Sequence, residues 1–127
     1  MNFLQIEDLC VHFPVRGGVF RKAIGACKAV DGVSFTLSKG RTLGLVGESG
    51  CGKSTLAKSI VQLVRPTAGS IHFKGHLLDP KKEAYDYRKS VQMVFQDPAE
   101  SLNSRMTVGA IVKEPLDIHE IGEKKSR

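Results

Sequence analysis

Eight residues near the middle of the chain have the types and spacing of a phosphate-binding loop. Residues 47–54 read Gly-Glu-Ser-Gly-Cys-Gly-Lys-Ser, a full match to G-x-x-x-x-G-K-[ST]. Glycines allow the backbone to turn its N–H groups inward around an anion. The pattern predicts that backbone N–H groups of residues 50–55 hold α- and β-phosphates, while Lys53 binds the β- and γ-phosphates. The Ser54 hydroxyl is then expected to bind a Mg²⁺ ion that bridges them.

Two elements are expected to position this loop, which we call the phosphate loop. The apolar run of residues 42–46 is typical of a strand buried on both faces of a parallel sheet. Residues 53–64 predict a helix whose N-terminus points at the phosphates, ended by Pro66. The apolar stripe of this helix consists of Leu56, Ile60, Leu63 and Val64.

Other segments predict a mixture of strands and short helices. Alternating apolar residues indicate half-buried strands at residues 9–13 and 33–37, joined by a loop or long hairpin connection over residues 14–28. An edge strand is expected at 71–73 and a further strand at 91–95. A short surface helix is expected at 81–89, with Tyr85 and Tyr87 in packing or surface roles. A second helix is expected to be capped by Thr107 and disrupted by Pro115, and the polar tail at 122–127 is expected to be frayed.

Composition indicates one soluble globular domain. The chain has 127 residues, 41% of them hydrophobic and 25% charged, with no apolar run long enough to span a bilayer and no secretory pattern at its start. The net charge of +6 favours a phosphate-bearing partner without choosing among nucleotide, nucleic acid and anionic lipid.

Cysteine and histidine spacing does not favour a metal site or a disulfide framework. The three cysteines are an odd number without a Cys-x-x-Cys pair, and reduced thiols in a cytosolic protein are expected. Cys51 lies within the phosphate loop and needs no role beyond that of a small residue. The four histidines, which are not expected to be metal ligands, are His12, His72, His76 and His119.

Beyond the phosphate loop, the sequence resembles the ATP-binding subunits of ABC transporters, specifically those of the oligopeptide/dipeptide importer subfamily. The resemblance covers nearly the whole chain in register. The residues that carry it are 28–35 (Lys-Ala-Val-Asp-Gly-Val-Ser-Phe), 40–56, 92–98 (Gln-Met-Val-Phe-Gln-Asp-Pro) and 101–109 (Ser-Leu-Asn-Ser-Arg-Met-Thr-Val-Gly). The Gln-Asp-Pro segment with Ser-Leu-Asn after it is far more specific than the phosphate loop alone.

The resemblance implies roles for two further residues. Gln96 matches the glutamine of the Q-loop, which in the family contacts Mg²⁺ and the attacking water, and whose loop docks on the membrane subunit. Phe13 matches the aromatic residue that stacks on adenine, although Phe20 in the same region is an alternative. The candidate catalytic residues are therefore Lys53 and Gln96, and the metal-binding candidates are Ser54 and Gln96. The candidate nucleotide-binding residues are Phe13, Gly47, Glu48, Ser49, Gly50, Cys51, Gly52, Lys53, Ser54 and Thr55.

Three family motifs do not occur in this sequence: the Leu-Ser-Gly-Gly-Gln signature, the Walker B strand with its Asp-Glu, and the switch histidine. In the family they lie downstream of Gln96, so residues 1–127 are expected to form the N-terminal part of a nucleotide-binding domain that binds nucleotide without hydrolysing it well. The expected fold class is α/β: a P-loop NTPase core of the ABC ATPase type, with parallel strands ending in the phosphate loop, an N-terminal antiparallel β-subdomain, and truncation before the helical subdomain.

The resemblance also implies an activity for the intact protein. It would bind and hydrolyse ATP with Mg²⁺ to drive peptide import, as a peripheral subunit at the cytoplasmic face of the cell membrane. Its partners would be transmembrane permease subunits, reached through the Q-loop region, a second ATP-binding subunit and, indirectly, a peptide-binding protein. Nucleic acid is not an expected partner.

Three alternatives stay open from the sequence. An ABC-type ATPase that acts on DNA is compatible with the basic charge, but the chain lacks a basic stripe interleaved with aromatic residues. A P-loop kinase or GTPase is less compatible, because no Asn-Lys-x-Asp motif or evident substrate lid occurs. A truncated, non-catalytic transporter subunit is the third.

Overall fold

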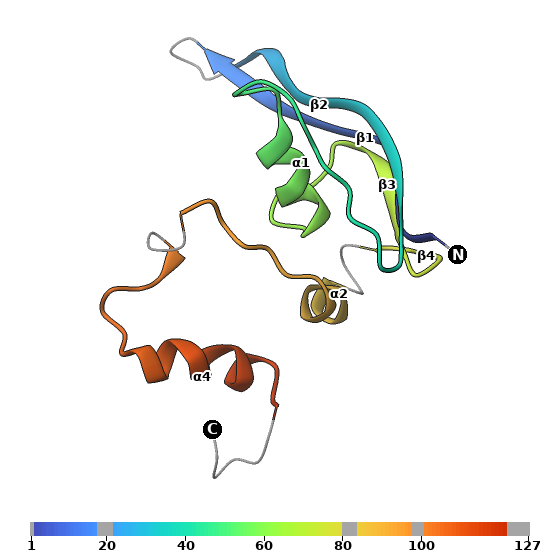
Figure 1. The fold of residues 1–127 in the computed structure, drawn as a ribbon. Helices are drawn as coiled ribbons and strands as arrows, with labels where there is room; N and C mark the ends of the chain where they lie inside the picture. Colours follow the sequence, from blue (N-terminus) through green and yellow to red (C-terminus); the bar gives the residue numbers. More distant parts are fainter. Residues whose placement is uncertain (1, 18–21, 80–83, 98–100, 122–127) are drawn as a thin grey trace. The chain divides into compact units, whose positions relative to one another are not determined.

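The computed structural model describes residues 2–17, 22–79, 84–97 and 101–121. The chain divides into two compact units, Met1–Arg88 and Lys89–Arg127, and each is described by itself. The first unit contains an antiparallel sheet and the helix that follows the phosphate loop, and the second contains an irregular segment and a longer helix (Figure 1). The first unit therefore carries most of the regular structure.

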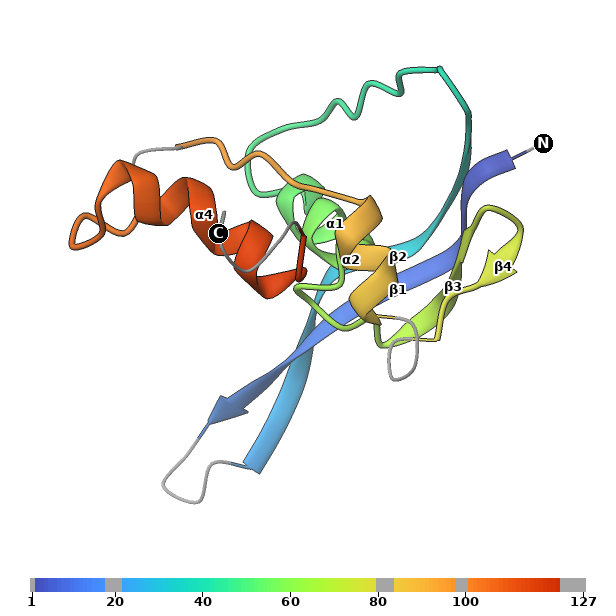
Figure 2. The ribbon, with the colours of Figure 1, turned by 90° about the horizontal axis from the view of Figure 1, so that it is seen from below.

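The sheet has four strands in the order β2-β1-β3-β4, and every neighbouring pair is antiparallel. The strands β1 and β2 form a long, twisted hairpin, and β3 pairs with the part of β1 away from the hairpin end (Figure 2). This arrangement confirms the predicted strands at 9–13 and 33–37, and residues 14–17 and 22–28 form the arms of the hairpin. The strand predicted at 71–73 also forms, but not at an edge, because β4 pairs with it on the side away from β1. The strand bounds are β1 Asn2–Gly17, β2 Lys22–Ser38, β3 Ala68–Phe73 and β4 His76–Leu77.

The core of the first unit lies between the sheet and the helix α1 (Lys53–Ile60). Leu56 of α1 is buried, as are Val11 of β1 and Val30 of β2. The predicted alternation holds along β2, where residues 33, 35 and 37 are half-buried and the residues between them are exposed. In the part of the chain that the structure describes, the other buried apolar residues are Ile6, Leu9, Ile71, Leu78 and Tyr87.

The helix α1 ends earlier than the sequence predicts. Its last helical residue is Ile60, and Gln62 adopts a left-handed φ of 59°. The N–H of Leu63 donates to the carbonyl of Lys58 at 2.8 Å and that of Gln62 to Ser59 at 3.0 Å, the bonding pattern of a Schellman motif. The helix therefore ends at this Schellman motif, several residues before Pro66.

Two predicted strands are not formed in the described part of the chain. Residues 41–48 and 91–95 have no strand pairing, and in the first segment Val46 is 94% exposed. A strand needs hydrogen-bonding neighbours, and none of the described strands pairs with either segment. The expected parallel strands that end in the phosphate loop are thus absent from these residues, and the sheet present is the antiparallel one.

The helix α2 (Ala84–Ser90) confirms the described part of the helix predicted at 81–89, and residues 81–83 lie outside the described residues. Tyr87 is buried, with its ring edge-on to Phe73 at 5.1 Å between centroids, whereas Tyr85 is exposed. Both tyrosines thus have the packing or surface roles expected of them.

In the second unit, the helix α4 (Val108–Ile118) begins as predicted at Thr107, whose hydroxyl accepts the N–H of Ala110 at 3.3 Å. It continues through Pro115, contrary to expectation. None of the helices in the described ranges is both long and apolar enough to cross a bilayer. The predicted frayed tail, 122–127, falls outside the described residues.

Candidate phosphate-binding site

The phosphate loop connects an exposed, extended segment to the start of α1. Residues 47–51 are exposed, and the turns within the loop use positive φ angles of 81° at Gly50 and 96° at Gly52. Residues with side chains rarely adopt such angles, so glycine is strongly favoured at these positions. Gly52 is also the N-cap residue of α1, so the turn leads directly into the helix.

Close packing on β2 fixes the end of the loop. A Cβ atom at Gly52 would collide with the carbonyl oxygen of Ala29 and approach the Val30 side chain. Along the hairpin, Val11 pairs with Val30 but the next residue, His12, pairs with Lys28, so Ala29 is an extra residue in β2. This β-bulge at Ala29 is what the glycine backbone packs against.

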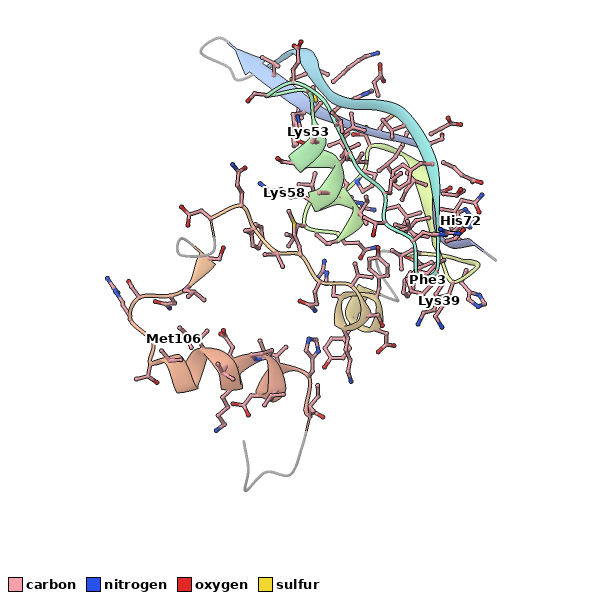
Figure 3. All side chains as sticks on the ribbon, in the orientation of Figure 1. Phe3, Lys39, Lys53, Lys58, His72 and Met106 are labelled. Carbon is pink, nitrogen blue, oxygen red and sulfur yellow. The ribbon has the colours of Figure 1, made fainter. Side chains whose placement is uncertain are left out.

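The Lys53 side chain folds back over the loop (Figure 3). Its Nζ donates to the carbonyl oxygens of Gly47 at 2.6 Å and Glu48 at 2.5 Å, and it lies 3.4 Å from the sulfur of Cys51. The ammonium is therefore held at the centre of the loop by neutral carbonyl groups. Charged phosphate oxygens would be stronger acceptors for the same donor.

The N-terminus of α1 has neither a side-chain cap nor an acidic residue in its first turn. Gly52 provides no side chain to cap the helix, and the first turn contains no acidic residue. The first N–H groups of a helix have no intrahelical partner and carry its positive dipole end. Ser54, in this first turn, is exposed, and Thr55 is half-buried. The loop, the lysine and the helix start together suit a bound polyanion.

The other predicted site residues lie elsewhere. Phe13 is on the hairpin arm of β1, where it pairs with Cys27 and its side chain is 44% exposed. Its alternative, Phe20, lies outside the described residues. Gln96 belongs to the second unit, is exposed, and borders a shallow depression with Phe95, Asp97 and Ser101. The assignments of Phe13 and Gln96 therefore remain predictions.

A group of side chains that the sequence analysis did not connect meets on the hairpin. Cys10, His12 and Asp31 bring one sulfur, one ring nitrogen and one carboxylate oxygen within 4.8 Å of one another. The pKa of Asp31 is lowered by hydrogen bonds from Lys28 and then from His12. Residues 10 and 12 share a strand face by alternation, but only the pairing of β1 with β2 brings Asp31 to them.

Comparison with known proteins links this chain to one family. The family model for ABC transporters matches residues 30–126. The chain is 49% identical over 129 residues to the oligopeptide transport ATP-binding protein AppF of Bacillus subtilis (strain 168), covering 99% of this chain and 39% of AppF. It is 50% identical over 117 residues to the oligopeptide transport ATP-binding protein OppF of Salmonella typhimurium, covering 89% of this chain and 35% of OppF. The chain therefore spans about two fifths of the length of these relatives.

Solved structures have a similar fold. One described as the ATP-binding subunit of an ABC transporter superposes with a TM-score of 0.69 at 22% identity, covering 95% of this chain and 44% of its own. A nucleotide-free ATP-binding cassette from an ABC transporter has a TM-score of 0.61 at 28% identity, covering 79% of this chain and 35% of its own. The predicted fold class, that of the ABC ATPases, is confirmed.

Proposed function

Because this chain belongs to the ABC transporter family, we propose that it is the ATP-binding part of an importer of oligopeptides or dipeptides. The single observation that carries the proposal is the geometry at the start of α1, where two left-handed glycines precede an uncapped helix N-terminus and a lysine. The names of AppF and OppF supply the substrate class, which we extend to this chain on the strength of their 49% and 50% identity.

The phosphates of ATP fit this loop through its own backbone and one side chain. The N–H groups of residues 50–55 hold the α- and β-phosphates, in the region where Gly50 and Gly52 give the chain its turns. Lys53 exchanges the carbonyls of Gly47 and Glu48 for oxygens of the β- and γ-phosphates. That exchange replaces two hydrogen bonds to neutral groups by charge-assisted ones, which are roughly twice as strong.

Magnesium is the cofactor that we assign to the same site. Ser54 supplies a hydroxyl oxygen from the first turn of α1, and oxygen is the ligand type that Mg²⁺ prefers. The ion would neutralise charge on the β- and γ-phosphates. Gln96 is the second proposed ligand, and its carboxamide oxygen would also orient the attacking water in the intact protein.

The partners follow from the same proposal. The region around Gln96 docks on transmembrane permease subunits, and a second ATP-binding subunit completes the hydrolytic site. A peptide-binding protein delivers the substrate, and the ATP-binding subunit lies at the cytoplasmic face of the membrane. Residues 1–127 act as part of one nucleotide-binding domain. Since they contain no signature, Walker B or switch histidine motif, we propose that this chain alone binds ATP without efficient hydrolysis.

The test is the removal of the loop ammonium. Lys53→Ala is expected to weaken binding of a fluorescent ATP analogue with Mg²⁺ at least several-fold, because the charge-assisted contact is lost. The control is Lys58→Ala, which removes an exposed ammonium from the same helix, and it is expected to bind like the unaltered chain. Fluorescence anisotropy measures both affinities. Equal binding by Lys53→Ala and Lys58→Ala would contradict the proposal.

A further inference from the structure

A second β-bulge in β2 brings together three side chains that can bind a metal ion. Leu9 pairs with Val33 and Val11 with Val30, so Cys10 alone on β1 faces both Asp31 and Gly32 on β2. Gly32 adopts a left-handed φ of 69°, which is the conformation that glycine supplies at many bulges. Bulges redirect side chains, and here the carboxylate of Asp31 is turned toward Cys10 and His12 on the neighbouring strand.

Two of the three distances between the potential ligand atoms are close to those of a tetrahedral zinc site. Nε2 of His12 lies 3.0 Å from Oδ1 of Asp31, and Sγ of Cys10 lies 3.9 Å from the same oxygen. With zinc bonds of about 2.0 to 2.3 Å, neighbouring ligand atoms in a tetrahedron are roughly 3.3 to 3.7 Å apart. Adjustments of a few tenths of an ångström would bring these two distances into that range. The sulfur of Cys10 and the ring nitrogen of His12, which lie within 4.8 Å of each other, would also have to reach it on binding.

Neighbouring groups outside the cluster contact two of the three ligands. The N–H of Gly32 donates to Sγ of Cys10 at 3.2 Å, a contact that stabilises negative charge on sulfur. Lys28 donates to Oδ2 of Asp31 at 3.1 Å, so Oδ1 is the oxygen that faces the cysteine and the histidine. Metal sites depend on such supporting contacts around their ligands, and this cluster has them.

The backbones that carry two of the ligands are fixed by one residue. The N–H of Thr67 donates to the carbonyl of Cys10 at 2.7 Å, and its hydroxyl accepts the N–H of His12 at 2.9 Å. Cys10 and His12 are thus tied at the same point to the segment that enters β3. Asp31 is half exposed and His12 one quarter exposed at their side chains, which leaves the cluster accessible to an ion from solvent.

We propose that Cys10, His12 and Asp31 form a binding site for a divalent ion of the zinc type, with water as the fourth ligand. Binding converts the thiol of Cys10 to a thiolate and releases its proton to solvent. Two anionic ligands then balance the two charges of the ion, and the hydrogen bond between His12 and Asp31 is replaced by two bonds to the metal. Nε2 of His12 gives up the proton that it donates to Asp31, and the ring binds as the neutral tautomer that carries its proton on Nδ1. Sulfur and imidazole select zinc over magnesium, so the site is chemically distinct from the one assigned to Ser54.

This assignment differs from the expectation drawn from sequence spacing. Cys10 and His12 are only two residues apart, but the third ligand, Asp31, comes from the neighbouring strand and is brought to them by a bulge. The competing interpretation is that His12, Asp31 and Lys28 form only a surface ion-pair network, with Cys10 as a neighbour. The two interpretations differ in whether the sulfur binds a metal, and that can be measured directly.

The experiment is a cobalt(II) titration of the full chain with its thiols reduced. Cobalt substitutes for zinc and gives an ultraviolet charge-transfer band when a thiolate is bound. We expect the band to saturate at one equivalent and to disappear when zinc is added. Cys10→Ser, His12→Gln and Asp31→Asn are each expected to raise the dissociation constant for cobalt at least about tenfold, and Cys10→Ser is expected to remove the band.

Matched controls come from the other cysteines and from a second histidine–carboxylate pair. Cys27→Ser and Cys51→Ser are expected to keep the band, and so is His72→Gln, whose side chain pairs with Glu7 at 3.3 Å. Circular dichroism verifies that each variant is folded. If Cys10→Ser does not fold, Asp31→Asn serves as the test variant, because it preserves the volume of the side chain. A titration without the band, or a band that survives in Cys10→Ser or in folded Asp31→Asn with unchanged affinity, would overturn the proposal.

Discussion

At Gly52 the backbone combines a φ of 96° with close contact to the bulge at Ala29. A side chain at this position would strain the backbone conformation and would also collide with the carbonyl oxygen of Ala29 in β2. Gly52→Ala is therefore expected to lower the free energy of unfolding by on the order of 2 kcal/mol or more. Urea denaturation monitored by circular dichroism measures this change.

The matched control is Gly44→Ala, since a Cβ at Gly44 meets no atom within 4 Å. It is expected to change the free energy of unfolding by less than about 0.5 kcal/mol. A loss at Gly52 no larger than the loss at Gly44 would show that the glycine is not required by packing on β2.

At the scale of elements, Tyr87 of α2 connects the C-terminus of α1 to the sheet. Its hydroxyl donates to the carbonyl of Ile60 at 2.7 Å, and its ring packs against Phe73. Tyr87→Phe keeps the ring but leaves that carbonyl without this donor, so we expect a loss of about 1 kcal/mol in unfolding free energy. Tyr85→Phe, at an exposed position of the same helix, is expected to cost less than half as much.

The same tyrosine predicts a dependence on alkaline pH. Burial raises the pKa of Tyr87 to about 12, from the ordinary value of 10.0. Because the unfolded chain then loses the phenol proton first, the contribution of Tyr87 to stability is complete below pH 10 and is lost as the pH rises toward 12. Tyr87→Phe should lack this decline when urea midpoints are measured across that range. An identical decline in both proteins would contradict the assignment.

The sequence predicted helices and strands correctly where nearby residues determine them. It failed where an element depends on hydrogen bonding to a strand elsewhere in the chain. The Thr107 cap, the alternation along β2 and the start of α1 depend on nearby residues, and all three are confirmed. The apolar segments 42–46 and 91–95 need neighbouring strands that the described residues do not supply. Periodicity could not reveal the end of α1 either, because it depends on a left-handed Gln62.

The two candidate sites differ in the same respect. Residues 47–54 are contiguous, so spacing alone identified them. The cluster of Cys10, His12 and Asp31 depends on the register of two strands and on an extra residue in β2, which no pattern in the sequence specifies. A site whose residues are brought together by strand pairing can be found only once the pairing is known from the structure.

At the scale of the whole molecule, the two units differ in how much they bury. Among the described residues, those that are buried all lie within Met1–Arg88, and none lies within Lys89–Arg127. Local stability follows burial, so amide protons of the central strand β1 should exchange far more slowly than those of α4. Hydrogen exchange followed by mass spectrometry measures both. Equal protection of α4 and β1 would contradict this picture.

Two of the bulges of β2 lie within four residues, Ala29 through Gly32, and they contact different neighbours. One supports the turn at Gly52, and the other turns Asp31 toward Cys10. A single-residue deletion in this stretch can keep the later residues of β2 in register only by removing one of these bulges, and with it the contact at Gly52 or the orientation of Asp31. If both bulges are kept instead, the register slips by one residue and every later side chain of β2 changes to the opposite face. The length of this stretch is therefore constrained more strictly than its composition, and substitutions should be tolerated here far more often than gaps.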